Sequence, residues 1–451
     1  MPLFIAGTQS GCGKTTVTLA LMQYLRTQGK IVAPFKAGPD FLDPMWHQAV
    51  CQRTSYHLDT RMMGKRMSIQ CFHEKSKDAD VSVIEGVMGL FDGVKGVGGE
   101  GSSAHLAKTL AVPVILVVSA KGMSGSMVAL VEGFVARAKT MDVMIGGIIA
   151  NHVGSENHAK ILRELLTDFE LPPLLAWMGK DAPTLPERHL GLKMPSEQDL
   201  PDFSDAFHVE KDCLTTEIQR QREHKGSDKA QHQEHQRHIT KQASQNTSTP
   251  LYPCDTLLNG TIIAVAKDAA FCFIYPENLE WLKQHGADVQ MFSPLAGEPV
   301  PQASDALWLP GGYPELHLES LSNSKSLASM VDFIEAGQPV LAECGGMMVL
   351  GEHIVTTKPQ SHEEKKHAMA GILSCDFIMQ DKLAGLGYRE DASGVRGHEF
   401  HHSKRSNHVD FMPAFDVQRG DVGIRYKHVR ASYIHWYFAS QPEEVASWFG
   451  L

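Results

Sequence analysis

A glycine-rich loop near the N-terminus is the first segment whose residue types and spacing could carry out chemistry. The sequence GTQSGCGKTT, residues 7–16, follows an apolar run of strand length and precedes a helical pattern. Glycines let backbone amides turn inward around a polyphosphate, and the N-terminus of the following helix adds partial positive charge. Thr8 stands where the usual loop has its first glycine, so this is the variant that is one residue longer. We expect a nucleotide to bind at Ser10, Gly11, Gly13, Lys14, Thr15 and Thr16.

Four carboxylates after two further strand-like runs could complete a magnesium and substrate site. Asp40 and Asp43 lie in GPDFLDP, and Glu85 and Asp92 lie in EGVMGLFDG. Ligands of parallel sheets collect beyond the carboxyl ends of the strands, where both segments fall. One such residue alone is more often a turn former or a helix cap, but four beside a phosphate loop favour metal and substrate roles. In that loop the hydroxyl of Thr15 is the expected magnesium ligand, and the lysine before it would reach the phosphates.

A candidate nucleophile lies in the second half of the chain. The sequence VLAECGGMMVL, residues 340–350, predicts a strand, a sharp turn that carries Cys344, and a helix. We expect the thiol to be exposed at the edge of a sheet, with its pKa lowered by the helix N-terminus. Both properties favour a nucleophilic thiolate. The amide of Gly345, together with Gly311 and Gly312 in LPGGYP, could form an oxyanion hole.

A cysteine nucleophile needs a base, which is usually distant in sequence. His435 closes the strand-like run ASYIHW, a setting that suits a fixed catalytic position. The other candidates are His398, His401 and His402 in RGHEFHHS. We interpret that cluster as a hydrogen-bonded structural or interface element, with metal binding as the alternative.

Both halves of the chain alternate apolar runs with helical patterns, which predicts two α/β domains with mainly parallel sheets. The runs are residues 3–6, 31–35, 81–84, 114–118 and 145–150, then 261–266, 289–292, 306–309 and 340–342. Residues 217–250 are rich in Gln, His, Lys, Arg and Ser, which is typical of a solvated, mobile linker. We therefore expect a nucleotide-binding domain at 1–200, a flexible polar linker at 201–255 and a second domain at 256–451.

Composition excludes several classes of function. The 42 basic and 52 acidic residues give a net charge of −10, which argues against nucleic-acid or anionic-membrane partners. No apolar run approaches the roughly 18 residues that span a bilayer, and the N-terminus does not resemble a secretory signal. The eight cysteines are scattered, without a C-x-x-C pair, as is typical of free thiols in a reducing compartment. We expect a cytoplasmic protein.

Several short motifs follow one another in the order seen in one known family. They are SGCGKTT, GPDFLDP, GVMGLFDG, PERHLGL, AFCF, PGGYPE, AECGG and GHEFHHS. The ordered set, which spans about residues 5 to 440 apart from the linker, resembles the cobyrinic acid a,c-diamide synthases. The resemblance implies a P-loop NTPase domain of the dethiobiotin-synthetase type, followed by a triad-type (class I) glutamine amidotransferase domain.

The resemblance also implies a reaction with ATP, Mg²⁺ and L-glutamine. Cys344, made more nucleophilic by His435, would release ammonia from glutamine. ATP would convert a corrinoid carboxylate to an acyl phosphate, which that ammonia displaces. Many related amidotransferases carry a glutamate two residues after the histidine, but this sequence has Tyr437 there, so a Cys–His dyad is expected.

Roles of the remaining site residues are carried over from the same resemblance. Asp40 and Glu85 would bind Mg²⁺ with Thr15, Asp43 and Asp92 would face the tetrapyrrole, and Asn151 would contact adenine. The alternatives are the same reaction on hydrogenobyrinic acid or nickel-sirohydrochlorin. A more remote one is a nucleotide switch with an inactive glutaminase-like module. The sequence leaves a homodimer open.

Overall fold

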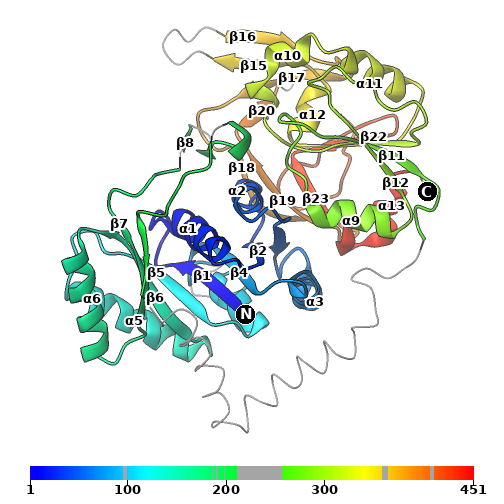
Figure 1. The fold of residues 1–451 in the computed structure, drawn as a ribbon. Coiled ribbons are helices and arrows are strands. Elements are labelled where there is room, and N and C mark those ends of the chain that lie inside the picture. The colour runs from blue at the N-terminus through cyan, green and yellow to red at the C-terminus, as the bar shows by residue number, and fades with distance from the viewer. Residues whose placement is uncertain are drawn as a thin grey trace. The chain divides into compact units, whose positions relative to one another are not determined.

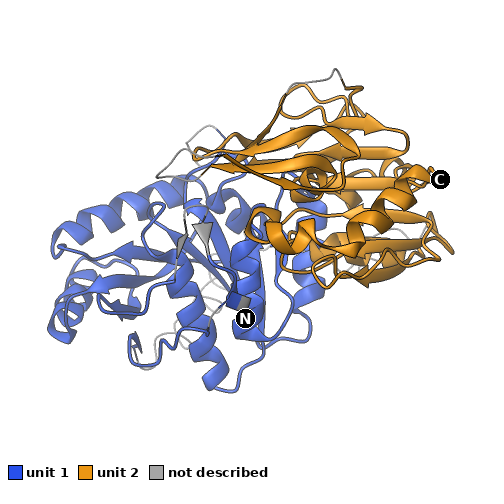
Figure 2. Cartoon of the chain, turned by 90° about the horizontal axis from the view of Figure 1, so that it is seen from above, with its two compact units in different colours: residues 1–251 blue, residues 252–451 orange. Residues whose placement is uncertain are grey.

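The computed structural model of the chain forms two compact units, Met1–Leu251 and Tyr252–Leu451 (Figure 2). It describes residues 1–94, 99–185, 187–188, 191–197, 199–210, 256–357, 364–406 and 411–450. Most of the expected linker, residues 211–255, lies outside the described residues. The start of that segment differs from the expectation, because Phe207–Val209 forms strand β10 at the edge of the first unit's sheet.

An eight-stranded sheet forms the centre of the first unit, in the order β10-β7-β6-β5-β1-β4-β2-β3 (Figure 1). Neighbouring strands are parallel except for β10, which is antiparallel to β7. The strands are β1 (Pro2–Gly7), β2 (Val32–Ala37), β3 (Tyr56–Leu58), β4 (Val81–Gly89), β5 (Val114–Ser119), β6 (Ile145–Val153), β7 (Leu174–Gly179) and β10, with a small separate hairpin of β8 (Glu187–Arg188) and β9 (Gly191–Leu192). The helices are α1 (Lys14–Thr27), α2 (Leu42–Cys51), α3 (Gly64–Ser76), α4 (Ser103–Leu110), α5 (Ser126–Thr140), α6 (Glu156–Asp168) and the 3-10 turn η1 (Pro195–Glu197).

Helices cover both faces of this sheet, so its central strands are apolar on both sides. The strands up to β3 are added toward one edge of the sheet, and β4 to β7 are added toward the opposite edge. Because crossovers between parallel strands are right-handed, α1 and α2 lie on one face and α3 to α6 lie on the other. Val17, Leu21 and Leu25 recur at helical spacing along α1 and pack in one core with Leu3 and Val83 of the sheet. This burial explains why the strands read as continuous apolar runs rather than alternating ones.

The register of the central strands brings the candidate residues of the first unit together. Lys36 of β2 pairs with Glu85 of β4, and the end of β1 lies between β4 and β5. Because these strands are parallel, their carboxyl ends and the loops that follow lie at one edge of the sheet.

The second unit is built around a six-stranded sheet, in the order β12-β11-β13-β14-β22-β21, with only β21 antiparallel. Two smaller sheets have the orders β16-β15-β17-β20 and β18-β19-β23. The strands of the large sheet are β11 (Ile262–Ala266), β12 (Asp288–Phe292), β13 (Ala306–Leu309), β14 (Val340–Glu343), β21 (Ile424–Tyr426) and β22 (Val429–Ser432). Those of the small sheets are β15 (Gly351–Thr357), β16 (Glu364–Ala368), β17 (Leu373–Met379), β18 (Gly385–Glu390), β19 (Arg396–His401), β20 (Ser403–Arg405) and β23 (Ile434–Tyr437). The helices are α9 (Pro276–Gln284), α10 (Leu318–Ser322), α11 (Lys325–Glu335), α12 (Gly345–Val349) and α13 (Pro442–Ser447), with 3-10 turns η2 (Pro314–Leu316) and η3 (Phe438–Ser440).

Each strand expected from the sequence is present, and the expected α/β class is confirmed. The two small sheets were not anticipated, because strands such as β16, β18 and β19 carry many polar residues and lack the apolar runs of the parallel strands. Within the described residues, no helix is both long and apolar enough to cross a membrane.

Candidate active sites

The phosphate loop of the first unit lies between β1 and α1. Gly13 is in the left-handed conformation with φ 83°, and a Cβ at this position would lie only 2.0 Å from Nδ2 of Asn151. That nitrogen donates a hydrogen bond to the carbonyl of Cys12 at 3.0 Å. Asn151 is buried, so the structure places it as a brace of the loop backbone. Ser10 and Gly11 are exposed at the loop tip, while residues 13–16 are half-buried.

Glu85 connects the loop to the sheet. Its Oε1 accepts hydrogen bonds from Lys14 Nζ at 2.9 Å and Thr15 Oγ1 at 2.7 Å. Its Oε2 lies 2.8 Å from Nε2 of His47, and Lys36 Nζ is 3.3 Å from Oε1. Burial by itself would raise the pKa of Glu85, but the cations Lys14 and Lys36 and the bond with His47 bring it well below its usual range. Glu85 is therefore a fully buried, ionised carboxylate at the phosphate loop.

Asp43 lies beside this group as a buried partner of Lys36. Burial and the nearby carboxylates Asp40 and Glu85 raise the pKa of Asp43 to about 7, against the lowering effect of Lys36. For Lys36, burial alone would lower the pKa, but the surrounding carboxylates raise it above its usual value. Lys36 thus holds the side chains of Asp43 and Glu85 together beside the phosphate loop.

Asp40 and Asp92 have local backbone roles as well as a place near the loop. Oδ1 of Asp40 accepts the amides of Leu42 at 2.8 Å and Asp43 at 3.2 Å, at the start of α2. Oδ2 of Asp92 accepts the amide of Gly89 at 2.9 Å, at the end of β4. The structure brings Asp40, Asp43 and Glu85 into one electrostatic group, whereas Asp92 is exposed and lies in the turn after β4.

In the second unit, Cys344 occupies the sharp turn between β14 and α12. Its backbone has φ 46° and ψ −109°, a positive-φ conformation that is rare for a residue with a side chain. The amide of Cys344 donates to the carbonyl of Ser432 at 2.7 Å, which ties the turn to the end of β22. Such strain persists only where surrounding contacts impose it, and it is concentrated at functional sites.

Three glycines allow the segments around Cys344 to approach closely. A Cβ at Gly311 would lie 2.3 Å from Cε1 of His435 and 3.3 Å from Cβ of Cys344, so both side chains flank this glycine. A Cβ at Gly345 would lie 3.1 Å from the amide nitrogen of Gly312. The structure therefore brings together all five residues expected at the thiol site.

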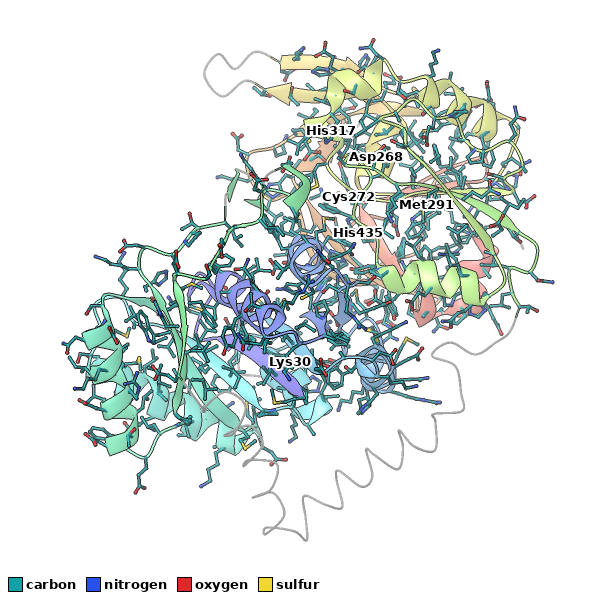
Figure 3. All side chains as sticks on the ribbon, in the orientation of Figure 1. Lys30, Asp268, Cys272, Met291, His317 and His435 are labelled. Carbon is teal, nitrogen blue, oxygen red and sulfur yellow. The ribbon has the colours of Figure 1, made fainter. Side chains whose placement is uncertain are left out.

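His435 lies on β23 and is buried inside the second unit (Figure 3). It pairs in register with His398 of β19, and their rings are stacked with centroids 5.0 Å apart. Nδ1 of His398 is 2.6 Å from the hydroxyl of Tyr275, whose ring also contacts Tyr437 edge-on. Tyr437, which occupies the position of the triad glutamate in related amidotransferases, therefore makes an aromatic contact with Tyr275.

The comparisons with known proteins cover both units. A family described as the CobQ/CobB/MinD/ParA nucleotide binding domain matches residues 3–192, and the CobB/CobQ-like glutamine amidotransferase domain matches residues 262–443. The cobyrinate a,c-diamide synthase of Priestia megaterium is 38% identical, covering 99% of this chain and 96% of that protein. The hydrogenobyrinate a,c-diamide synthase of Stutzerimonas stutzeri is 36% identical, covering 99% and 97%.

The chain belongs to the cobyrinate a,c-diamide synthase family. The resemblance carried by the motifs is thereby confirmed, and with it the assignment as a glutamine-hydrolysing amide ligase with an ATP-binding domain. The matches also confirm the order of the domains, with the nucleotide-binding domain first.

The expected exposure and lowered pKa of the Cys344 thiol are both wrong. Cys344 is buried rather than exposed, and burial raises the pKa of its thiol above the usual value, with Glu315 adding to the effect. The helix that was expected to lower this pKa is only five residues long. Before glutamine binds, the resting state of Cys344 is therefore a protonated thiol.

Several residues that support the two sites were not found from the sequence. Lys36 and His47 are buried around Glu85, and the only sequence signal for Lys36 was a lysine within an otherwise apolar run. In the second unit, Glu343 accepts the amide of Trp436 at 2.8 Å and Nε1 of Trp308 at 3.0 Å. Glu343 directly precedes Cys344, and Trp436 directly follows His435, so this hydrogen bond connects the two segments that carry the cysteine and the histidine.

Replacement of Gly311 by alanine should nearly abolish glutamine hydrolysis. The added methyl group would collide with the His435 ring at 2.3 Å and displace it from Cys344. Since misplacing a catalytic group by about 1 Å can cost about 100-fold, we expect a loss of that order in kcat for ammonia release. The matched control is Gly133→Ala, on an exposed stretch of α5, where the added methyl group would meet no neighbouring atom within 4 Å. Normal glutaminase activity in the Gly311 variant would contradict this arrangement.

Acid should destabilise the second unit partly through His435. Burial, and to a lesser degree His401, lower the pKa of His435 from 6.5 to about 3, while Glu399 opposes the change. As the pH falls below 6.5, the unfolded chain takes up a proton here that the folded chain does not. The stabilisation is therefore complete above pH 6.5 and is lost progressively toward pH 3. In urea unfolding at a series of pH values, His435→Gln should lose less free energy of unfolding than the wild type, and identical pH slopes would refute the assignment.

Proposed function

We propose that the chain converts the a and c acetate carboxylates of cobyrinic acid to amides, at the expense of ATP and glutamine. The observation that carries this proposal is the similarity to cobyrinate a,c-diamide synthases over nearly the whole length of both proteins. The two sites support it, since one carries a phosphate loop with buried carboxylates and the other a strained cysteine beside a histidine.

At the thiol site, Cys344 supplies the nucleophile. Its sulfur forms a bond to the side-chain carbonyl carbon of glutamine as the thiol proton passes through His435 to the departing nitrogen, which leaves as ammonia. The amide nitrogen of Gly312 lies 3.1 Å from where a Cβ of Gly345 would be, and we propose that the amides of these two glycines donate to the developing oxyanion. Water then cleaves the thioester and releases glutamate.

At the phosphate loop, a corrinoid carboxylate oxygen takes the γ-phosphoryl group of ATP, and ADP leaves. Ammonia then attacks the acyl carbon and expels phosphate, which is a far better leaving group than an oxide. We propose that Lys14 and the loop amides hold the phosphates and that Asp43 and Asp92 lie toward the corrinoid. Asn151 braces the loop backbone through the carbonyl of Cys12, and we propose that it also contacts adenine.

The donor set at the loop fits a magnesium ion. Thr15 Oγ1 and Glu85 Oε1 are hard oxygen ligands that already lie 2.7 Å apart, and Asp40 belongs to the same charged group. We propose that these three residues hold Mg²⁺, which would neutralise charge on the phosphates when bound. Lys36 and His47 orient the Glu85 carboxylate toward the loop.

A second candidate substrate is hydrogenobyrinic acid, because one relative of 36% identity is a hydrogenobyrinate a,c-diamide synthase.

We propose a reducing, cytoplasmic location, since the six described cysteines are free thiols and the reaction consumes ATP.

Mass spectrometry of the reaction products tests the function. Purified protein is incubated with ATP, Mg²⁺, glutamine and cobyrinic acid, with parallel reactions on hydrogenobyrinic acid and nickel-sirohydrochlorin. Conversion of two carboxylates to amides on cobyrinic acid is the expected result. Faster conversion of either other tetrapyrrole would reassign the substrate, and no amidation on all three would refute the proposal.

A further inference from the structure

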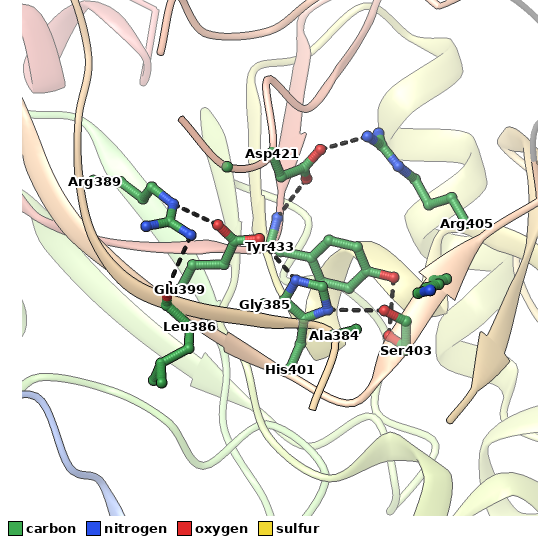
Figure 4. Close-up of a pocket in the computed structure, with 12 residues that line it drawn as sticks. Ala384, Gly385, Leu386, Arg389, Glu399, His401, Ser403, Arg405, Asp421 and Tyr433 are labelled. Atoms are coloured by element: carbon green, nitrogen blue, oxygen red, sulfur yellow. Dashed lines mark hydrogen bonds and ion pairs between the residues drawn. The ribbon is translucent and has the colours of Figure 1, made fainter. Parts of the chain in front are cut away.

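A polar pocket in the second unit adjoins the Cys344–His435 pair. Its volume is about 580 Å³, and residues of β18, β19 and β20 line it together with Tyr433 (Figure 4). Phe400 lies between the lining residues Glu399 and His401, and its carbonyl oxygen is 4.0 Å from the sulfur of Cys344. The pocket therefore lies within the length of one small molecule from the nucleophile.

Glu399 supplies a fixed negative charge to this pocket. Its Oε2 accepts from Nε of Arg389 at 2.5 Å, and its Oε1 lies 2.8 Å from Nε2 of His401. Burial alone would raise the pKa of Glu399, but the bonds with His401 and Arg389 keep it below its usual value. The other nitrogens of Arg389 donate to the carbonyls of Tyr388 and Leu386, so this cation holds Glu399 in place.

Two glycines pack closely against the carboxylate of Glu399. A Cβ at Gly385 would lie 2.5 Å from Oε1, and a Cβ at Gly420 would lie 2.3 Å from Oε2. Both glycines line the pocket, as Figure 4 shows for Gly385. The Cβ at Gly385 would also lie 2.2 Å from Nε2 of His401, and that at Gly420 would lie 2.0 Å from Nε of Arg389, so a side chain at either glycine would displace Glu399 and its partners.

A second ion pair lies in the lining of the pocket, apart from the pair of Glu399 and Arg389 (Figure 4). Lys404 and Arg405 lie there, and Arg405 forms an ion pair with Asp421. Asp421 also accepts the amides of Tyr433 at 2.8 Å and Gly423 at 3.1 Å, which fixes the position of the pair. The pocket thus presents a carboxylate and a guanidinium in separate places, as a zwitterion requires.

We propose that this pocket binds the α-amino and α-carboxylate groups of glutamine, with Glu399 receiving the ammonium and Arg405 the carboxylate. The inference rests on the proposed role of Cys344 as the nucleophile that attacks glutamine. Glutamine is the substrate that needs both charges recognised at one end while its side-chain amide reaches the sulfur. Glu399 and Arg405 are thus specificity-determining residues for the amide donor.

Substrate analogues that lack one charge test this assignment. Ammonia release is measured as kcat/KM with L-glutamine, with glutaramate, which lacks the ammonium, and with 4-aminobutanamide, which lacks the carboxylate. The wild type should prefer L-glutamine by about 100-fold or more, because an unmatched buried charge is costly. Glu399→Gln should reduce the preference over glutaramate by about tenfold or more, and Arg405→Gln should do the same for the preference over 4-aminobutanamide.

Each result separates this inference from the proposed function. If the wild type hydrolyses glutamine but each variant slows glutamine and its matching analogue equally, the pocket assignment is wrong. If the wild type releases no ammonia from glutamine, the proposed function fails as well.

Gly385→Ala keeps every charge and should raise KM for glutamine about tenfold, with a smaller change in kcat, so it tests the pocket even if a charge variant does not fold. An unchanged KM would overturn the proposal, and Gly133→Ala serves again as the matched control.

Discussion

The Cys344→Ser variant should lose glutamine-dependent amidation by about three orders of magnitude or more, yet still amidate the corrinoid when ammonium salt is supplied. A serine hydroxyl in the same buried turn is a much weaker nucleophile than a thiol, so the thioester would not form. The phosphate loop belongs to the other unit and contains none of the altered atoms. Activity is measured by mass spectrometry with glutamine and with ammonium chloride at raised pH, where free ammonia is present.

The control for this experiment is Cys375→Ser, which changes another buried cysteine of the same unit. That variant should retain both activities. If Cys344→Ser loses the ammonium-driven reaction as well, while its melting temperature matches the wild type, the separation of the two chemistries is wrong.

Replacement of Glu85 by glutamine should produce the opposite pattern, with glutaminase activity retained and amidation lost by about 100-fold or more. Neutralising this carboxylate removes the group that binds both Lys14 and Thr15 at the phosphate loop. It also leaves Lys36 with less compensating charge in a fully buried site, and breaking such a pair costs about 3–5 kcal/mol of folding free energy. Ammonium-driven amidation and the urea unfolding curve are the two measurements.

Glu164→Gln is the matched control in the same unit, because that glutamate is exposed on α6 and its nearest cation is 3.9 Å away. It should change neither measurement. Amidation by the Glu85 variant at the wild-type rate would exclude Glu85 from the phosphate site.

The motifs were informative because each is a local arrangement. In the phosphate loop, the loop shape and the helix that follows depend on about ten consecutive residues, and the structure shows both. Cys344 with its two following glycines is likewise a local strand–turn–helix unit. A local unit of this kind can be predicted because few distant contacts decide its conformation.

The supporting residues depended on strand register, which the sequence does not display. Lys36 and Glu85 are 49 residues apart and meet because β2 and β4 are register partners. Glu343 and Trp436 are 93 residues apart and meet where the end of β14 contacts β23. The pocket around Glu399 likewise depends on β18 and β19 pairing so that Gly385 lies opposite His401.

The residue sequence by itself determined the two chemistries, since the phosphate loop, the four carboxylates, the cysteine and the histidine are all recognisable from type and spacing. Only the tertiary structure decided their ionisation. Helix position alone predicted a lowered thiol pKa for Cys344, but burial raises it, and burial depends on every segment that packs around the turn. For Glu85 the balance is reversed, because two lysines and a histidine from other elements outweigh the same cost of burial. The charge of a buried group depends on all neighbouring groups at once, and folding alone brings them together.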